Sequence, residues 1–198
     1  MGCSSLGKAC FPIASSIHDI VCLLIFTVCG ILGIDAYSTT GVSTSLAGSY
    51  MSAGDADGAG TVAQFNRPMG TVARTTGTAT LYIADSANDK IKQLDLYSGN
   101  VTTLAGKGYP GMVDGDAAVA KFSTPTGLAL THLTETTLYV ADMENHKIRW
   151  VAVDTGLTGT TVGGGYSNYP DNFDGTGTGA GVLETDTLAS LLAVGRLH

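Results

Sequence analysis

The chain contains the same segment twice. Residues 81–92 return as residues 138–149, 57 positions later, and the register continues outside this segment because Phe65 recurs as Phe122 at the same offset. Self-similarity at a fixed period is the signature of stacked copies of one small structural unit. A repeat architecture therefore constrains the fold of this chain more than any single residue does.

Each copy predicts four short strands. Apolar runs rich in β-branched and aromatic residues are separated by the Gly, Pro, Asp, Asn and Thr residues that mark turns, and no long 3.6-residue pattern competes with them. The predicted strands are residues 69–73, 80–84, 90–95 and 101–105 in the first copy, and residues 126–130, 138–141, 147–153 and 160–164 in the second. Four short antiparallel strands at a fixed period are typical of a β-propeller blade.

The motifs of both copies resemble the NHL repeat. The second copy carries Tyr-Val-Ala-Asp at 139–142 and Asn-His-Lys-Ile-Arg at 145–149, whereas the first copy has Asp89 in place of the His. The loop before each copy resembles a variant of the family in which Leu-Ala-Gly is followed by Asp-Gly, Phe and Pro. The resemblance covers residues 42–176, about two-thirds of the chain, and it implies a propeller.

The predicted fold class is all-β: a partial, open β-propeller of four-stranded antiparallel blades, with an N-terminal apolar helix. We expect NHL repeats over residues 42–176, with full blades at about 68–106 and 125–164 and an incomplete third blade or divergent tail at 177–198. A closed ring needs about 4 to 8 blades. Two full blades agree with three explanations: a truncated gene model, an open arc held by partners, or several chains that assemble one ring.

An apolar run at residues 20–34 indicates a targeting segment. Lys8 precedes it and small residues follow it, with cleavage expected after Ala36. This is the form of a signal peptide, and the run is short for a membrane-spanning helix, which needs about 20 residues. Residues 1–36 are therefore predicted to be a signal peptide or a signal anchor, with a buried structural segment as the third interpretation, so the protein is expected to be secreted or at the cell surface.

The positions of the cysteines and the net charge argue against two kinds of site, cysteine-based sites and nucleic-acid-binding surfaces. All the cysteines lie in the N-terminal segment, at Cys3, Cys10, Cys22 and Cys29. The predicted blades therefore contain no thiol nucleophile and no cysteine metal site. The formal net charge is −7, and the 10 basic residues are scattered. Nucleic acid is bound through clustered Lys and Arg, so no nucleic-acid partner is expected.

Two Asp–Asn pairs recur in the repeat. Asp85 precedes Asn88 by three residues, and Asp142 precedes Asn145 by the same spacing. Such side chains accept bonds from nearby backbone N–H groups and stabilise tight turns. We interpret the four residues as structural turn residues, with cation ligation as the alternative.

No metal site or cofactor is predicted. Asp55, Asp57, Asp114 and Asp116 lie in Gly-rich loops that superficially resemble calcium loops. Calcium needs about 6 to 8 oxygen ligands, and neither loop shows the full spacing of ligands. We interpret these residues as solvated turn residues.

No catalytic residues are predicted either. The four histidines have no acid–base or metal-binding spacing, and nothing resembles a Ser-His-Asp arrangement. Related propellers include amidating lyases and calcium-dependent lactonases, whose signatures need blades that this sequence does not contain. The expectation is therefore a non-enzyme, with a fragment of a propeller enzyme as the alternative.

Loop aromatics supply the candidate binding residues, Tyr109, Tyr166 and Tyr169. Aromatic side chains often form partner contacts, although packing between blades is the competing explanation. The predicted function is a non-catalytic scaffold that presents loops to a protein or carbohydrate partner outside the cell or at its surface. The other partner predictions are a membrane tether through residues 20–34 and self-assembly that completes the ring. An intracellular protein-interaction scaffold is a further alternative.

Overall fold

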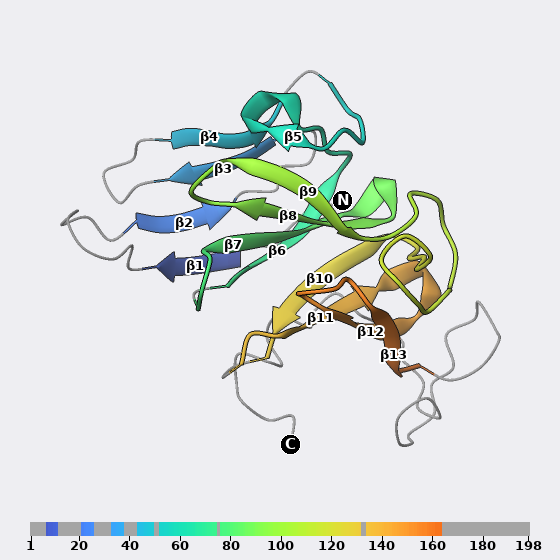
Figure 1. Ribbon diagram of the computed structural model, residues 1–198. Helices are drawn as coiled ribbons and strands as arrows, with labels where there is room; N and C mark the ends of the chain where they lie inside the picture. The colour runs from blue at the N-terminus through green and yellow to red at the C-terminus, as the bar shows by residue number, and fades with distance from the viewer. Residues whose placement is uncertain are drawn as a thin grey trace.

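The computed structural model describes residues 7–11, 21–25, 33–37, 43–49, 52–74, 76–131 and 134–163. These residues form β-strands in antiparallel sheets together with three short 3-10 helices, and no α-helix occurs among them (Figure 1). The predicted all-β class is confirmed at this level. None of the described helices is long and apolar enough to cross a membrane.

The first sheet contains the strands of the first sequence copy, and each predicted strand is confirmed to within one residue at its ends. A fifth, two-residue strand, which the sequence did not suggest, comes from the preceding loop and pairs with the outermost strand. The order is β5-β9-β8-β7-β6. The strands are β5 (Gly58–Ala59), β6 (Pro68–Arg74), β7 (Thr80–Asp85), β8 (Lys90–Asp95) and β9 (Asn100–Ala105).

The second sheet contains the strands of the second copy in the simple order β10-β11-β12-β13. They are β10 (Pro125–Leu130), β11 (Thr137–Asp142), β12 (Lys147–Ala152) and β13 (Thr158–Val162). The predicted strands are again confirmed, to within two residues at their ends.

Short 3-10 helices connect the strands. They are η1 (Gly60–Val62), η2 (Ser86–Asn88) and η3 (Met143–Asn145). After η2 and η3 the chain adopts the left-handed conformation, at Asp89 with φ 52° and at His146 with φ 51°. Asp and His are both found in this conformation more often than most residues, so the equivalent turns keep one geometry with two different side chains.

The predicted N-terminal apolar helix is wrong. The structure places β1 (Gly7–Phe11), β2 (Val21–Ile25), β3 (Gly33–Tyr37) and β4 (Ser43–Gly48) in this part of the chain, with β1 paired to β2 and β3 paired to β4. A short apolar run does not distinguish a helix from a buried strand. Here the run is divided between β2 and β3, which lie beside each other (Figure 1).

The core lies on both faces of the first sheet. Successive side chains of β7 point to opposite faces: Leu81 and Ile83 join the apolar cluster with Ile34 of β3, whereas Tyr82 joins the cluster with Leu138 of the second sheet. The first sheet is thus packed between the N-terminal strands and the second sheet.

The two sheets meet where β6 lies beside β10 (Figure 1). A Cβ atom on Gly70 of β6 would collide with the carbonyl oxygen of Thr126 in β10. Glycine at this position therefore allows the two backbones to approach closely.

Candidate functional site

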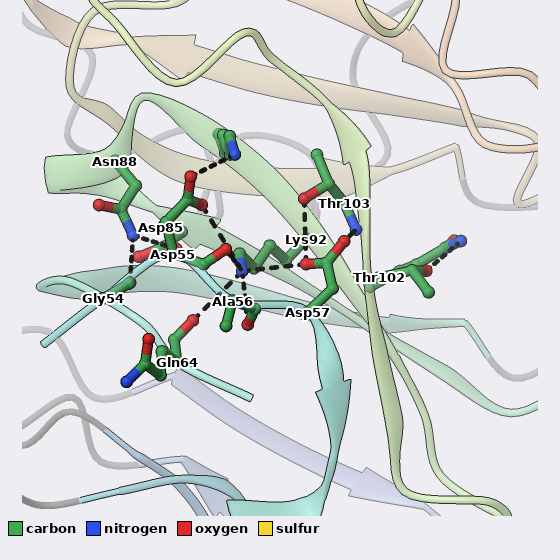
Figure 2. Close-up of polar contacts among 12 residues, drawn as sticks. Gly54, Asp55, Ala56, Asp57, Gln64, Asp85, Asn88, Lys92, Thr102 and Thr103 are labelled. Atoms are coloured by element: carbon green, nitrogen blue, oxygen red, sulfur yellow. Dashed lines mark hydrogen bonds and ion pairs between the residues drawn. The ribbon is translucent and has the colours of Figure 1, made fainter. Parts of the chain in front are cut away.

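A buried lysine fastens the incoming loop to the first sheet (Figure 2). Lys92 lies in β8 and is fully buried. Its Nζ donates to the carbonyl oxygens of Asp55 (3.1 Å), Ala56 (3.3 Å) and Gln64 (3.2 Å), and it forms an ion pair with Asp57 Oδ1 at 3.0 Å. A buried charge is tolerated when it is paired and hydrogen-bonded. This ammonium group therefore fixes the path of residues 55–64.

Arg149 of β12 occupies the equivalent position in the second sheet and is also fully buried. Nη1 donates to Lys121 O at 3.0 Å and Nη2 to Val113 O at 2.9 Å, which are the carbonyls equivalent to those of Gln64 and Ala56. Nη2 also pairs with Asp114 Oδ1 at 2.5 Å, and Nη1 pairs with Asp142 Oδ2 at 2.8 Å. The planar guanidinium group joins the incoming loop to β11, because its separate N–H groups point in fixed directions.

The Asp57 and Asp114 carboxylates continue these networks to the outer strands. Asp57 Oδ2 accepts a bond from the Thr103 backbone N–H at 2.8 Å, and Asp114 Oδ2 accepts one from the Thr160 N–H at 3.1 Å. Asp57 and Asp114 are therefore more than the solvated turn residues that were predicted. They are half-exposed, but each connects a buried cation to an outer strand.

The predicted turn residues Asp85 and Asn88 lie at η2 and contact the same incoming loop (Figure 2). Asp85 accepts from the Asn66 N–H (Oδ1, 2.7 Å) and from Asn88 Nδ2 (Oδ2, 2.8 Å), and Asn88 Nδ2 also donates to Gly54 O at 2.7 Å. These bonds reach beyond the turn itself. They tie η2 to both ends of the loop.

Asp142 and Asn145 repeat this geometry at η3. Asp142 accepts from the Ser123 N–H and from Asn145 Nδ2, both at 2.7 Å, and Asn145 Nδ2 donates to Gly111 O at 2.8 Å. Burial raises the pKa of Asp85 and of Asp142 to about 6, although the hydrogen bonds to each carboxylate oppose this shift. A structural rather than ligating role for the four residues stays a prediction, which their titration would test.

The departure from the repeat motif at Asp89 has a contact of its own. The Asp89 carboxylate accepts a bond from the Thr124 N–H at 2.8 Å, in the loop that enters the second sheet, and Ser86 Oγ donates to Pro125 O at 2.5 Å. These bonds join the two sheets. The equivalent residues of the second sheet, His146 and Met143, show no such bond within the described residues.

Among the predicted binding residues, Tyr109 is exposed and lies near two lysines. Its side chain is 44% exposed, and its ring centroid lies 4.4 Å from Lys121 Nζ and 5.6 Å from Lys107 Nζ. A hydrogen bond from Lys107 lowers the pKa of the Tyr109 phenol. Tyr166 and Tyr169 lie outside the described residues, so the structure places one of the three predicted binding residues.

A polar cavity of about 260 Å³ lies on the first sheet, and it is lined by Thr78, Thr80, Gln93, Asp95, Ser98, Asn100 and Thr102. Trp150 and Gly159 occupy the positions of Gln93 and Thr102 in the second sheet, 57 residues later. The Trp150 indole lies where a Cβ of residue 159 would be. An aromatic ring thus fills the surface that is hollow and hydroxyl-lined on the first sheet.

Lys92 and Arg149 each lie at the centre of one network, and neither was predicted from the sequence. A signal existed, since a basic residue occurs at the same position of both copies inside a predicted strand. Within the described ranges no group of three or more His, Cys, Asp or Glu side chains could hold a metal ion. The charged residues of the two networks bind loops and strands of their own chain.

No family model matches the chain. It is 40% identical over 103 residues to Protein SUPPRESSOR OF QUENCHING 1, chloroplastic, from Arabidopsis thaliana, and 40% identical over 103 residues to the human NHL repeat-containing protein 2. Each match covers 52% of this chain, but only 9% and 14% of the respective relatives. The resemblance to NHL-repeat proteins is therefore confirmed over about half of the chain, and the chain spans a small part of these relatives.

Solved structures share the fold. An auxiliary nutrient binding protein from Bacteroides ovatus matches with a TM-score of 0.54 and 28% identity, over 61% of this chain and 32% of that protein. A protein called a putative phosphatase, from Bacteroides thetaiotaomicron, matches with a TM-score of 0.55 over 75% of this chain and 35% of its own length. Its identity of 23% supports the fold alone.

Proposed function

We propose that the chain is part of a β-propeller that acts as a non-catalytic binding scaffold. The supporting observation is that the buried charged groups at equivalent positions of the two sheets fasten loops. Lys92 and Arg149 bind loop carbonyls, and Asp85 and Asp142 accept loop N–H groups. Buried charges that are hydrogen-bonded to the backbone of the same chain hold its loops in fixed positions. Loops on a rigid scaffold often carry the residues that bind a partner.

The burial of two equivalent tyrosines supports the proposal that the propeller has a further blade beside the second sheet. Tyr82 of β7 is 1% exposed, because the second sheet covers it, whereas Tyr139 of β11 is only partly buried. Tyr139 thus has the same position in the second sheet as Tyr82 has in the first, but it lacks an equivalent cover among the described residues. A further unit of the same kind on the far side of the second sheet would bury Tyr139 in the same way.

The proposed partner is a protein or a carbohydrate outside the cell or at its surface. The likeness to a protein described as nutrient binding supports a binding role. Export is proposed from the apolar run at residues 20–34, but β3 (Gly33–Tyr37) packs Ile34 into the core of the first sheet, so cleavage after Ala36 would remove a core strand. N-terminal sequencing of protein from the culture medium tests export: a start near Tyr37 would show cleavage of the signal, whereas a start before Gly33 would show that β3 is retained in the exported protein. Retention of the whole product in the cytosol would contradict it.

The binding role is tested with the full chain on arrays of glycans and of cell-surface proteins, alongside turnover assays with phosphate monoesters and lactones. We expect saturable binding to a ligand on these arrays and no turnover above the buffer rate. Turnover that disappears after substitution of a single polar residue, with the fold retained, would replace the scaffold by an enzyme.

A further inference from the structure

The loop between β9 and β10 carries a compact group of three side chains, Lys107, Tyr109 and Lys121. Both ammonium groups lie near the Tyr109 ring, and both lower the pKa of its phenol. Lys107 and Tyr109 are exposed and Lys121 is half-buried. Two cations and a phenol hydroxyl therefore face solvent from one place. We call these three residues the Tyr109 cluster.

The equivalent place in the preceding loop has a different chemistry. Ser52 and Gln64 stand 57 positions before Tyr109 and Lys121, and Gln64 Nε2 donates to Ser52 Oγ at 2.8 Å. The Gln64 side chain lies over Gly54, just as the Lys121 side chain lies over Gly111. A neutral pair is thus sufficient to bridge the loop. The aromatic ring and the positive charge of the Tyr109 cluster are additional to that structural requirement.

Several other basic residues of the two sheets have a carboxylate partner. Lys90 pairs with Asp55, Lys92 with Asp57 and Arg74 with Asp154. Lys107 and Lys121 have no carboxylate partner in the described part of the chain, although the protein contains 17 acidic residues against 10 basic ones. Carboxylates are the natural partners of ammonium groups, so two ammonium charges remain available to an external acid.

The backbone of this loop holds the cluster in place. Lys107 N–H donates to Ala120 O, Gly111 N–H donates to Phe122 O, and Lys121 N–H donates to Val113 O, each at 3.0 Å. Asn145 Nδ2 adds a bond to Gly111 O from η3. A loop that is ordered before binding loses little conformational entropy when a ligand arrives.

We propose that the Tyr109 cluster binds the carboxylate groups of an acidic peptide segment of a partner protein. This inference rests on the proposed scaffold function and names a partner chemistry for it. None of the three residues of the Tyr109 cluster lines the polar cavity of the first sheet. A small molecule usually needs a concave site, whereas an extended peptide can lie across an exposed loop and present neighbouring carboxylates to both lysines.

The test measures fluorescence anisotropy of labelled hexaglutamate with the full chain, and hexaglutamine is the uncharged control. The key variant is Tyr109→Ser with Lys121→Gln, which introduces the pair found at Ser52 and Gln64 and therefore preserves a known loop solution. The matched control is Arg67→Gln, which removes one exposed positive charge elsewhere. We expect roughly tenfold weaker binding of hexaglutamate by the double variant and less than about twofold change for the control.

Several outcomes would overturn the inference. Equal affinity of the double variant and the unmodified chain, or equal loss in Arg67→Gln, would show that the Tyr109 cluster is not the site. Binding of hexaglutamine as tightly as hexaglutamate would exclude carboxylate recognition, and binding of oligogalacturonate without hexaglutamate would assign the cluster to an acidic sugar. If the double variant binds hexaglutamate as tightly as the unmodified chain while a ligand found on the arrays binds both, the scaffold function stays intact and this cluster alone is refuted.

Discussion

The two sheets bind their incoming loops through different buried cations, Lys92 in the first sheet and Arg149 in the second. In the first sheet the Lys92 ammonium binds the incoming loop, and the hydrogen-bond donors to Asp85 among the described residues are neutral, the Asn66 N–H and Asn88 Nδ2. In the second sheet the Arg149 guanidinium binds the loop and also Asp142, so it connects two parts of the network that are separate in the first sheet. The repeat therefore specifies a buried positive charge at this position, while the side chain decides how many neighbours depend on it.

The largest expected difference comes from removing each cation. Arg149→Met leaves the fully buried Asp142 without its ion pair, and breaking a buried pair costs about 3–5 kcal/mol. Lys92→Met is expected to cost less, because Asp57 is partly exposed and can be hydrated. Urea denaturation followed by circular dichroism gives both free energies of unfolding. Equal losses would show that the additional link to Asp142 has no energetic weight.

The next effect concerns the contact between the sheets. Gly70→Ala forces a methyl group against the Thr126 carbonyl, and such overpacking costs about 1–3 kcal/mol. Gly127 has the same position in β10, one repeat later. Thermal denaturation of both alanine variants compares the two sheets, and we expect the smaller loss for Gly127→Ala in this chain. A loss as large as that of Gly70→Ala would indicate that another sheet packs against β10.

A smaller effect is expected at Asp89. Asp89→Ala removes the acceptor for the Thr124 N–H, and the loss of this bond should lower the free energy of unfolding by about 1 kcal/mol. Asp89→Asn retains a carbonyl acceptor and should recover part of this loss. His146→Ala places alanine at the same left-handed φ without removing, among the described residues, a hydrogen bond to the other sheet, so it measures the backbone strain alone, and Asp89→Ala should lose about 1 kcal/mol more than His146→Ala. The same denaturation assay checks all three variants. If Asp89→Asn is no better than Asp89→Ala, the hydrogen bond is not the reason for Asp at this position.

The smallest difference between the sheets is expected in their acid titration. Burial raises the pKa of both Asp85 and Asp142 to about 6, so carboxyl carbon NMR should show two similar midpoints near pH 6. Because the folded state holds these protons to a higher pH than the unfolded chain does, the two groups stabilise the protein below pH 4, and this stabilisation is lost as the pH rises through 6. Asp95 should titrate below its usual range, since the Tyr97 and Ser98 N–H groups bind its carboxylate.

Asp85→Asn and Asp142→Asn identify the source of this pH dependence. Each variant should remove its own NMR titration and flatten the dependence of stability on pH between 4 and 6. A midpoint for Asp142 far below that of Asp85 would show that the Arg149 guanidinium outweighs burial. That result would separate the two sheets by charge state as well as by contacts.

The strands of both sheets were predictable because their signals are local. Turn residues at Asp85–Asn88 and Asp142–Asn145 delimit apolar runs, and the second copy confirms the register of the first. The two cations were not predicted, because a charged residue in a strand normally indicates the solvent face. In β8 both Ile91 and Lys92 are buried. A sheet that is covered on both faces does not follow the simple alternation of an exposed sheet.

The N-terminal prediction failed for a related reason. The apolar run fits a helix as well as it fits strands, and only tertiary partners decide between the two. Ile34 of β3 lies in the apolar cluster of the first sheet, beside Ala47 of β4. Tyr109 is recognisable in the sequence as a loop aromatic, whereas the position of Lys121 beside its ring depends on the folded loop.

The short strand β5 also determines how another molecule can approach the rim of these sheets. Gly58 pairs with Val101 in β9, and one repeat later Gly115 pairs with Thr158 in β13. Both outermost strands therefore have peptide groups already engaged by the chain itself. An uncovered strand edge invites augmentation by a foreign strand and also aggregation. At these points of the rim, recognition falls to side chains rather than to main-chain pairing with the other molecule.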